Sequence, residues 1–466
     1  MIQIRKEIIL KLLIISIFGL VILAVIPFSV YAEELPEKDS EIQNTWNPEE
    51  GSYVISTVED LKAFRESLNT GETYYSERQV DGQTIREQTV VTLANDIVIP
   101  EGADIGTITK YTDKVSQKNA TNFEGYFNGH GHTISGFADD KAGLVDYLGY
   151  NGVITNLNIV VDIQFDNDSF YETEDGIGRK HLSIDYGVVC TNGEGQIKCC
   201  SVKGDVSFLY DLKVGDNVLG KGATFYGIRS PNMYSGKPID WLLCSDCYTS
   251  LNYNVKNDLE LDSTHIYGLT ECYSTRSSWR GALLNCYSSG SITWSVTDEN
   301  NKPVEKNAYA IGRLQSKEFV ENIYYDKTSW GKTLDESETV LNNPGLRTPI
   351  DNKGDLFKAS TYKGFDFENI WTTNGDTTMP ELRKDIPDEM LLPVIDDGGI
   401  KGDVNGDDKV DAKDVSEILQ VLKGSRTLSR EEKIRGDINN DDIIDKKDVF
   451  EIQQAIVGVD RLVNTY

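Results

Sequence analysis

The chain has 466 residues, of which 39% are hydrophobic and 26% are charged. A chain of this length and apolar content can bury a large core, which excludes a fully disordered or collagen-like protein. It carries 75 acidic and 46 basic residues, a formal net charge of -29. Because nucleic acids and anionic lipids bind basic surfaces, the charge predicts no nucleic-acid partner and no adhesion to such lipids.

The N-terminus has the features of a secretory signal. Basic residues precede an uncharged run over 12–30, and Val30-Tyr31-Ala32 offers small residues for cleavage. We therefore expect a signal peptide at 1–32, a secreted protein and no membrane attachment after cleavage. An uncleaved anchor is the alternative, since the run could nearly span a bilayer. The polar stretch 33–50 is typical of a linker.

One amphipathic helix opens the next region. Ser56 and Glu59 predict a capping box at its start. Its apolar stripe has spacings of three and four and comprises Val58, Leu61, Phe64 and Leu68. From there to residue 400 the pattern indicates short strands broken by turns rich in Gly, Asn and Ser.

A two-residue unit recurs along this strand-rich region. A polar turn residue, usually Asn or Asp, is followed by Cys, Leu or Ile. The second members are Leu157, Cys200, Cys247, Cys272, Cys286 and Ile323. Stacked coils of a parallel β-helix need such a unit, since the first residue tolerates the bend and the second points inward. Cys272 and Cys286 are too close in sequence for a full coil, so one of them should sit elsewhere. A β-sandwich is the alternative.

The seven cysteines all lie between Cys190 and Cys286. An odd number so clustered predicts buried core thiols, with one or two disulfides as the alternative. Cys244 and Cys247 form a CxxC motif, but the expected second pair of zinc ligands is missing.

Three motifs resemble a known family. The glycine-rich stretch 123–134 resembles the opening coils of bacterial surface proteins with GLUG-type repeats, and 285–290 resembles the repeat itself. Residues 364–371, together with 379–382, resemble the last part of such domains. The resemblance implies a mainly β chain, with a right-handed parallel β-helix of the pectin-lyase-like type over 51–384, capped by the N-terminal helix.

No motif in this region identifies catalytic residues. His130 lies between two glycines, which indicates a turn. No Gly-x-Ser-x-Gly nucleophile motif is present, and no carboxylate pair stands out. Four aromatic residues could stack on sugars, although packing between coils is the expected role: Trp294, Tyr324, Tyr325 and Trp330.

Beyond a linker at 385–401, the sequence repeats itself at an offset of 34. Residues 403–424 and 437–458 are identical at 12 of 22 positions. Oxygen-bearing side chains occupy loop positions 1, 3, 5, 9 and 12, with a backbone carbonyl at 7, as in an EF-hand-like calcium loop. We expect two Ca²⁺ ions, held by Asp403, Asn405, Asp407, Lys409, Asp411 and Asp414, and by Asp437, Asn439, Asp441, Ile443, Asp445 and Asp448.

Residues 402–462 closely resemble a type I dockerin, on the two calcium loops with Asp at position 12. The resemblance implies a small all-α module that binds a cohesin domain of a scaffoldin in a cellulosome. It also implies cohesin contacts at six positions: Ala412, Lys413, Gln420, Lys446, Lys447 and Gln454. Position 6, where an EF-hand has Gly, is Asp in both loops.

The preferred function is a β-helix module that the dockerin anchors to a polysaccharide-degrading complex outside the cell, at the cell surface, with plant cell-wall polysaccharide as a candidate partner. One alternative is an enzyme, a glycoside hydrolase or polysaccharide lyase built on the β-helix. Another is a surface adhesion or structural stalk protein.

Overall fold

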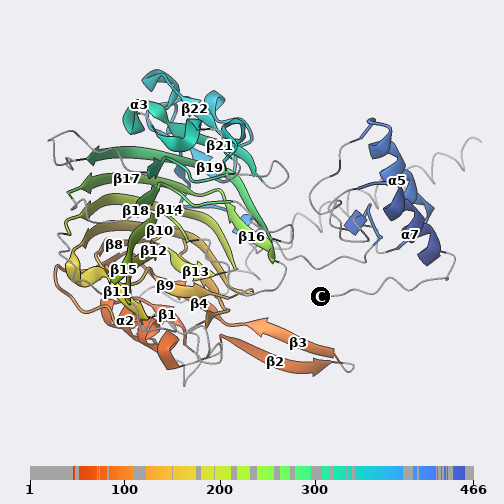
Figure 1. Cartoon of the computed structure of the whole chain (residues 1–466). Coiled ribbons are helices and arrows are strands. Elements are labelled where there is room, and N and C mark those ends of the chain that lie inside the picture. Colours follow the sequence, from red (N-terminus) through yellow and green to blue (C-terminus); the bar gives the residue numbers. More distant parts are fainter. Residues whose placement is uncertain are drawn as a thin grey trace, which may run out of the picture. The chain divides into compact units, whose positions relative to one another are not determined.

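The computed structural model describes residues 46–391 and 402–456, with gaps in both stretches (Figure 1). Besides one- and two-residue gaps, those stretches lack 48–51, 109–121, 175–179, 211–217, 231–238, 257–262, 273–278, 295–306, 315–319, 429–431 and 439–443. The expected signal peptide lies outside the described residues, as do most of the two expected linkers.

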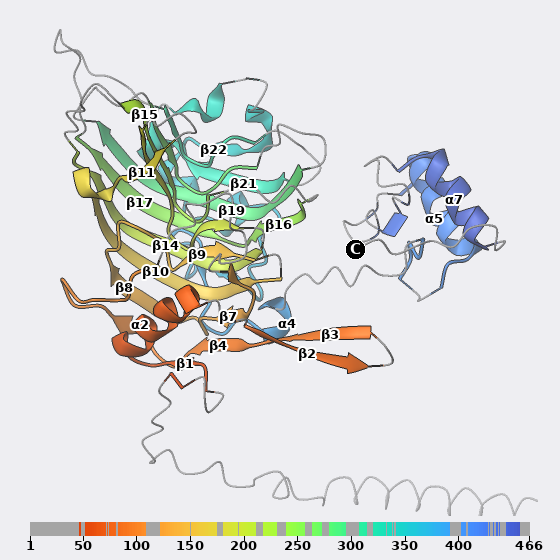
Figure 2. The ribbon, with the colours of Figure 1, turned by 60° about the horizontal axis from the view of Figure 1, so that its bottom comes forward.

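The largest sheet has twelve described strands, and all of its pairings are parallel. Each pass of the chain lays a strand beside the strand of the preceding pass, so the strands stack from β1 to β22 (Figures 1 and 2). The strands are β1 (Val54–Ile55), β4 (Val90–Leu93), β5 (Ile97–Val98), β7 (Tyr126–Asn128), β8 (Thr133–Phe137), β10 (Val153–Phe165), β14 (Gln196–Phe208), β16 (Ile239–Ser245), β17 (Tyr248–Val255), β19 (Trp279–Trp294), β21 (Val320–Asp326) and β22 (Thr348–Ile350).

Two smaller sheets follow the same stacking. One contains β11 (Tyr171–Glu174), β12 (Lys180–Gly187), β15 (Val218–Tyr226), β18 (Ser263–Tyr267) and β20 (Asn307–Tyr309), and only its β11–β12 pair is antiparallel. The other contains β6 (Asn122–Phe123), β9 (Val145–Leu148) and β13 (Cys190–Gly193). Two antiparallel pairs stand apart: β2 (Tyr75–Val80) with β3 (Gln83–Gln88), and β23 (Trp371–Thr372) with β24 (Glu381–Leu382). The predominantly parallel pairing differs from the antiparallel pairing of a β-sandwich.

The recurrent two-residue unit forms a stacked turn. Its first members have left-handed backbone conformations, with φ of 49° to 58°, at Asn156, Cys199, Asp246, Asn285 and Asn322. Asn and Asp tolerate this conformation better than most residues. The second members are buried and lie in register, since Leu157 pairs with Cys200 and Cys286 pairs with Ile323. The predicted bend followed by an inward residue is therefore confirmed at these five turns.

Cys272 does not belong to this row. It forms an isolated parallel bridge with Leu314, so the short interval before Cys286 is explained by a different place in the pass. All seven cysteines are buried free thiols, as expected from their number and clustering. Burial raises the pKa of the Cys190 thiol to about 12, which keeps it protonated.

The helix α2 (Val58–Ser67) lies beside β1 at the first end of the stack (Figure 2). It buries Leu61 and Phe64 in the main core, as its pattern predicts. Its capping box is formed by Thr57 and Asp60, one residue later than expected. Burial raises the pKa of Asp60, but hydrogen bonds from Trp46, Ser56 and Thr57 outweigh it and lower the pKa overall.

Residues 351–391, here called the closing segment, pack along the outside of the large sheet. Tyr248 and Tyr287 stack there with ring centroids 5.0 Å apart, and Trp371 packs on both. Tyr324 is buried in the same cluster, while Tyr325 and Trp330 lie in the main core. The packing role expected for these last three aromatic residues is confirmed; the side chain of Trp294 lies outside the described residues.

The closing segment also covers an ionisable turn residue. Trp371 Nε1 donates to Asp246 Oδ1 at 3.3 Å, and Asn285 Nδ2 donates to the same oxygen at 3.2 Å. The pKa of Asp246 is raised to about 6, mainly because the group is buried and in part because of the charge of Asp366. The two hydrogen bonds and the charge of Lys198 act in the opposite direction. Because the folded pKa exceeds the unfolded value, this group's contribution to stability is lost as the pH rises through 6.

We expect Asp246→Asn to stabilise the fold at pH 7 by up to about 3 kcal/mol, because a pKa shift of about two units is removed. At pH 4, where the carboxyl is protonated in the folded state, the gain should nearly disappear. Urea unfolding at both pH values measures this. Asn285→Asp is the matched control, since it adds a carboxylate beside Asp246 and should destabilise at pH 7. An equal effect of Asp246→Asn at both pH values would contradict the assignment.

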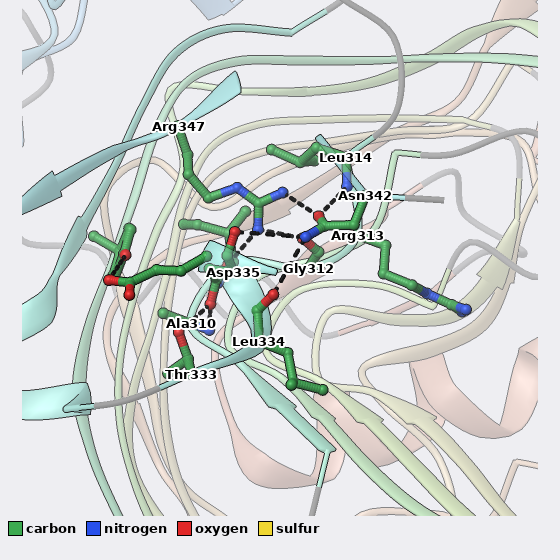
Figure 3. Close-up of polar contacts among 12 residues, drawn as sticks. Ala310, Gly312, Arg313, Leu314, Thr333, Leu334, Asp335, Asn342 and Arg347 are labelled. Carbon is green, nitrogen blue, oxygen red and sulfur yellow. Dashed lines mark hydrogen bonds and ion pairs between the residues drawn. The ribbon is translucent and has the colours of Figure 1, made fainter. Parts of the chain in front are cut away.

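A buried polar cluster closes the other end of the stack (Figure 3). Asp335 accepts from the amides of Ala310 and Ile311, which follow β20, and it pairs with Arg347. Arg347 also donates to Gly312 O at 2.9 Å and to Asn342 Oδ1 at 2.6 Å. These side chains satisfy backbone groups that a further strand would otherwise pair, which protects the edge from association.

Candidate metal centre

Two helices follow the two acidic loops: α5 (Ala412–Leu422) and α7 (Lys446–Ile456). They share a small apolar core made by Val404, Ile418, Leu428, Val449 and Ile452. The sequence places Leu419 and Leu422 on the same inward stripe as Ile418. The structure instead leaves both about 40% exposed, because the helix turns only one narrow side to this core.

The first loop closes around the carboxylate of Asp414, which is fully buried. Asp414 accepts from the amide of Asn405 at 3.1 Å and from the amide of Asp411 at 2.8 Å. At the start of the loop, Asp403 Oδ1 accepts from the amide of Gly406 at 2.9 Å. Loop positions 3, 9 and 12 are thus linked by hydrogen bonds, and position 1 is hydrogen-bonded to position 4.

The second loop repeats the hydrogen bonds at positions 9 to 12, but its position-12 carboxylate accepts from position 2 rather than position 3. Asp448 is fully buried and accepts from the amide of Ile438 at 2.9 Å and from that of Asp445 at 2.8 Å. Asp445 accepts from the amide of Lys447 at 2.6 Å, as Asp411 does from the amide of Lys413. The sequence repeat is therefore also a structural repeat at positions 9 to 12.

Several expected calcium ligands lie outside the described residues: Asp407, Asp437, Asn439, Asp441 and Ile443. The Asp residues at position 6 of both loops lie outside as well. Among the ligands that are described, no group of three or more His, Cys, Asp or Glu side chains converges closely enough to hold a metal. The complete ligand sets remain predictions.

The donor chemistry that is described fits calcium. Asp403 and Asp414 are buried carboxylates in one short loop, and burying a carboxylate is unfavourable unless its charge is compensated. The loop offers only oxygen ligands, which a hard cation such as Ca²⁺ prefers. Asp403, Asn405, Asp411 and Asp414, with the backbone carbonyl of Lys409, would hold the ion in the first loop, and Asp445 and Asp448 would do so in the second.

The expected partner-binding residues lie on the helices that leave the loops. Ala412, Lys413, Gln420, Lys446 and Lys447 are exposed; Gln454 is within α7, but its side chain lies outside the described residues. Phe450, a large apolar residue of α7 that is 60% exposed, was not among the expected contact residues. The sequence repeat could have indicated it, because the equivalent residue 34 positions earlier is the polar Ser416.

Comparison with known families identifies this module. Residues 401–457 match the family model of the dockerin type I domain. No curated protein and no solved structure gives a match to the chain. Within the described part, no helix is both long and apolar enough to cross a membrane. Residues 401–457 therefore form a type I dockerin domain, a calcium-binding, cohesin-binding module of the extracellular cellulosome type.

Proposed function

We propose that this chain is a secreted component of a cellulosome-like, polysaccharide-degrading complex. In this proposal residues 402–462 bind two Ca²⁺ ions and dock onto a cohesin domain of a scaffoldin at the cell surface. The observation that carries it is the dockerin type I match over paired loops whose position-12 carboxylates, Asp414 and Asp448, are both buried.

We further propose that residues 51–384 form a right-handed parallel β-helix capped by α2, which the dockerin presents to plant cell-wall polysaccharide. The parallel pairing and the five stacked turns support this fold. Because all seven cysteines are free thiols, its stability would come from stacked apolar side chains and strand hydrogen bonds rather than disulfides.

An enzymatic role would need an accessible acid beside a basic residue, and Glu271 lies beside Arg313. Glu271 pairs with Arg313, and the hydroxyl of Tyr226 donates to it at 2.9 Å. Burial raises its pKa, and only 1% of the residue is exposed. Since its partners already enclose it, we interpret Glu271 as a packing residue and propose no catalytic residues.

Capture of the full chain by immobilised cohesin domains tests the docking function. Binding should occur with Ca²⁺ and disappear in excess chelator. Asp414→Asn with Asp448→Asn should abolish capture, and Asp355→Asn, on an exposed turn far from the loops in sequence, is the control. Capture that survives chelation would contradict the proposed function. Binding of the chain to pectin, xylan and cellulose in the same assay tests the polysaccharide partner.

The two loop-exit faces should contribute unequally to cohesin binding. The second face carries Lys446 and Lys447, whereas the first carries Ala412 and Lys413, and all four are exposed. Lysines at an interface speed encounter with an acidic partner and make the binding salt-dependent. For an acidic cohesin, Lys446→Glu with Lys447→Glu should therefore weaken binding more than Ala412→Glu with Lys413→Glu, by about tenfold.

Surface plasmon resonance at low and high salt measures these affinities. Small, equal losses from each pair, with a large loss only for the four-site variant, would instead support docking in two orientations related by a half-turn. Full affinity of the four-site variant would show that the cohesin contacts lie elsewhere on the module.

A further inference from the structure

One arginine joins the second repeat to the first calcium loop. Arg435 precedes the second loop by two residues, yet its Nε donates to Asp403 O at 2.5 Å and its Nη2 donates to Val404 O at 3.1 Å. The amide of Gly402 donates in return to Arg435 O at 2.8 Å. The first two positions of the first loop are thus held by a residue from outside that loop.

The first repeat has no arginine at the equivalent position that could hold the second loop in the same way. The residue equivalent to Arg435, 34 positions earlier, is Lys401. A guanidinium presents a rigid fork that can bind two carbonyls together, whereas an ammonium is a point charge on a flexible stem. The first loop also leaves room for the fork, since a Cβ added to Gly406 would lie 3.2 Å from Arg435 Nη2.

We propose that Arg435 is a positioning residue that couples the two calcium loops, an inference that rests on the proposed calcium binding. The guanidinium fixes the peptide groups of Asp403 and Val404, and so sets the direction of the Asp403 carboxylate at loop position 1. Because Arg435 lies two residues before the second loop, calcium bound in that loop would also restrain the backbone of Arg435. The first loop is then preorganised, and the two sites bind calcium with positive cooperativity.

Calcium titration of the full chain by isothermal calorimetry tests the coupling. Arg435→Gln should weaken calcium binding to the first loop on the order of tenfold, because two charge-assisted hydrogen bonds are lost. Arg435→Lys keeps the charge and one donor, and should recover part of the affinity. Arg426→Gln is the matched control, because Arg426 pairs with Glu417 and Glu432 rather than with the loop.

A second variant separates coupling from general destabilisation. Asp448→Asn removes a ligand from the second loop, and in the wild-type background it should also weaken binding to the first. With Arg435→Gln already present, Asp448→Asn should leave the first site unchanged. Wild-type affinities in Arg435→Gln, or an undiminished effect of Asp448→Asn in that background, would overturn the proposal. A wild-type chain that binds no calcium would instead refute the proposed function itself.

Discussion

Removal of calcium should unfold residues 402–462 while leaving the strand-rich region intact. Residues 401–466 carry 11 basic and 15 acidic residues, a net charge of -4 that two Ca²⁺ ions would cancel. The described core of the module contains only five buried apolar residues. A core this small supplies little stability, so the binding free energy of the metal becomes the folding free energy.

Circular dichroism and limited proteolysis of the full chain measure this effect. In excess chelator, the helical signal should fall and cleavage should appear within 402–462, and added calcium should reverse both. At a calcium concentration 1,000 times the dissociation constant, one site stabilises the module by about 4 kcal/mol. Unchanged helicity and unchanged protease resistance in chelator would show that the module folds without metal.

Loss of Arg347 should strongly destabilise the strand-rich region. Arg347 and Asp335 form an ion pair with both side chains at most 1% exposed. Removing one partner of such a pair leaves an uncompensated buried charge, which costs about 3–5 kcal/mol. Arg347→Ala also removes the donors to Gly312 O and Asn342 Oδ1, so we expect its effect at the upper end of that range.

Urea unfolding of Arg347→Ala measures the free energy. Replacing both partners by apolar residues, as in Asp335→Leu with Arg347→Leu, should cost less than Arg347→Ala alone if the uncompensated charge dominates. Lys327→Ala is the control, because Lys327 pairs with Glu336 at the surface and its loss should leave stability nearly unchanged. A loss for Arg347→Ala no larger than for Lys327→Ala would contradict the capping role.

Sequence reasoning failed where neighbouring residues could serve equally well. Ser56 with Glu59 and Thr57 with Asp60 both satisfy the capping-box pattern. The second pair is used because the Asp60 carboxylate also accepts from the amide of Trp46 at 2.8 Å. That contact comes from a segment 14 residues away and cannot be read from the local pattern.

The calcium-loop pattern, the bends of the stacked turns and the inward-pointing cysteines could be predicted from the sequence, because each corresponds to a short local pattern of residue types. Each dockerin loop spans twelve residues, and the turn at Asp246 involves only Asp246 and Cys247. Three features required the folded structure: the ion pair of Asp335 with Arg347, the contact of Arg435 with the first loop, and the finding that Cys272 rather than Cys286 lies outside the row. These contacts depend on which segments of the chain pack side by side. Hydrophobic burial drives that packing, but the apolar pattern does not show which polar residues will meet.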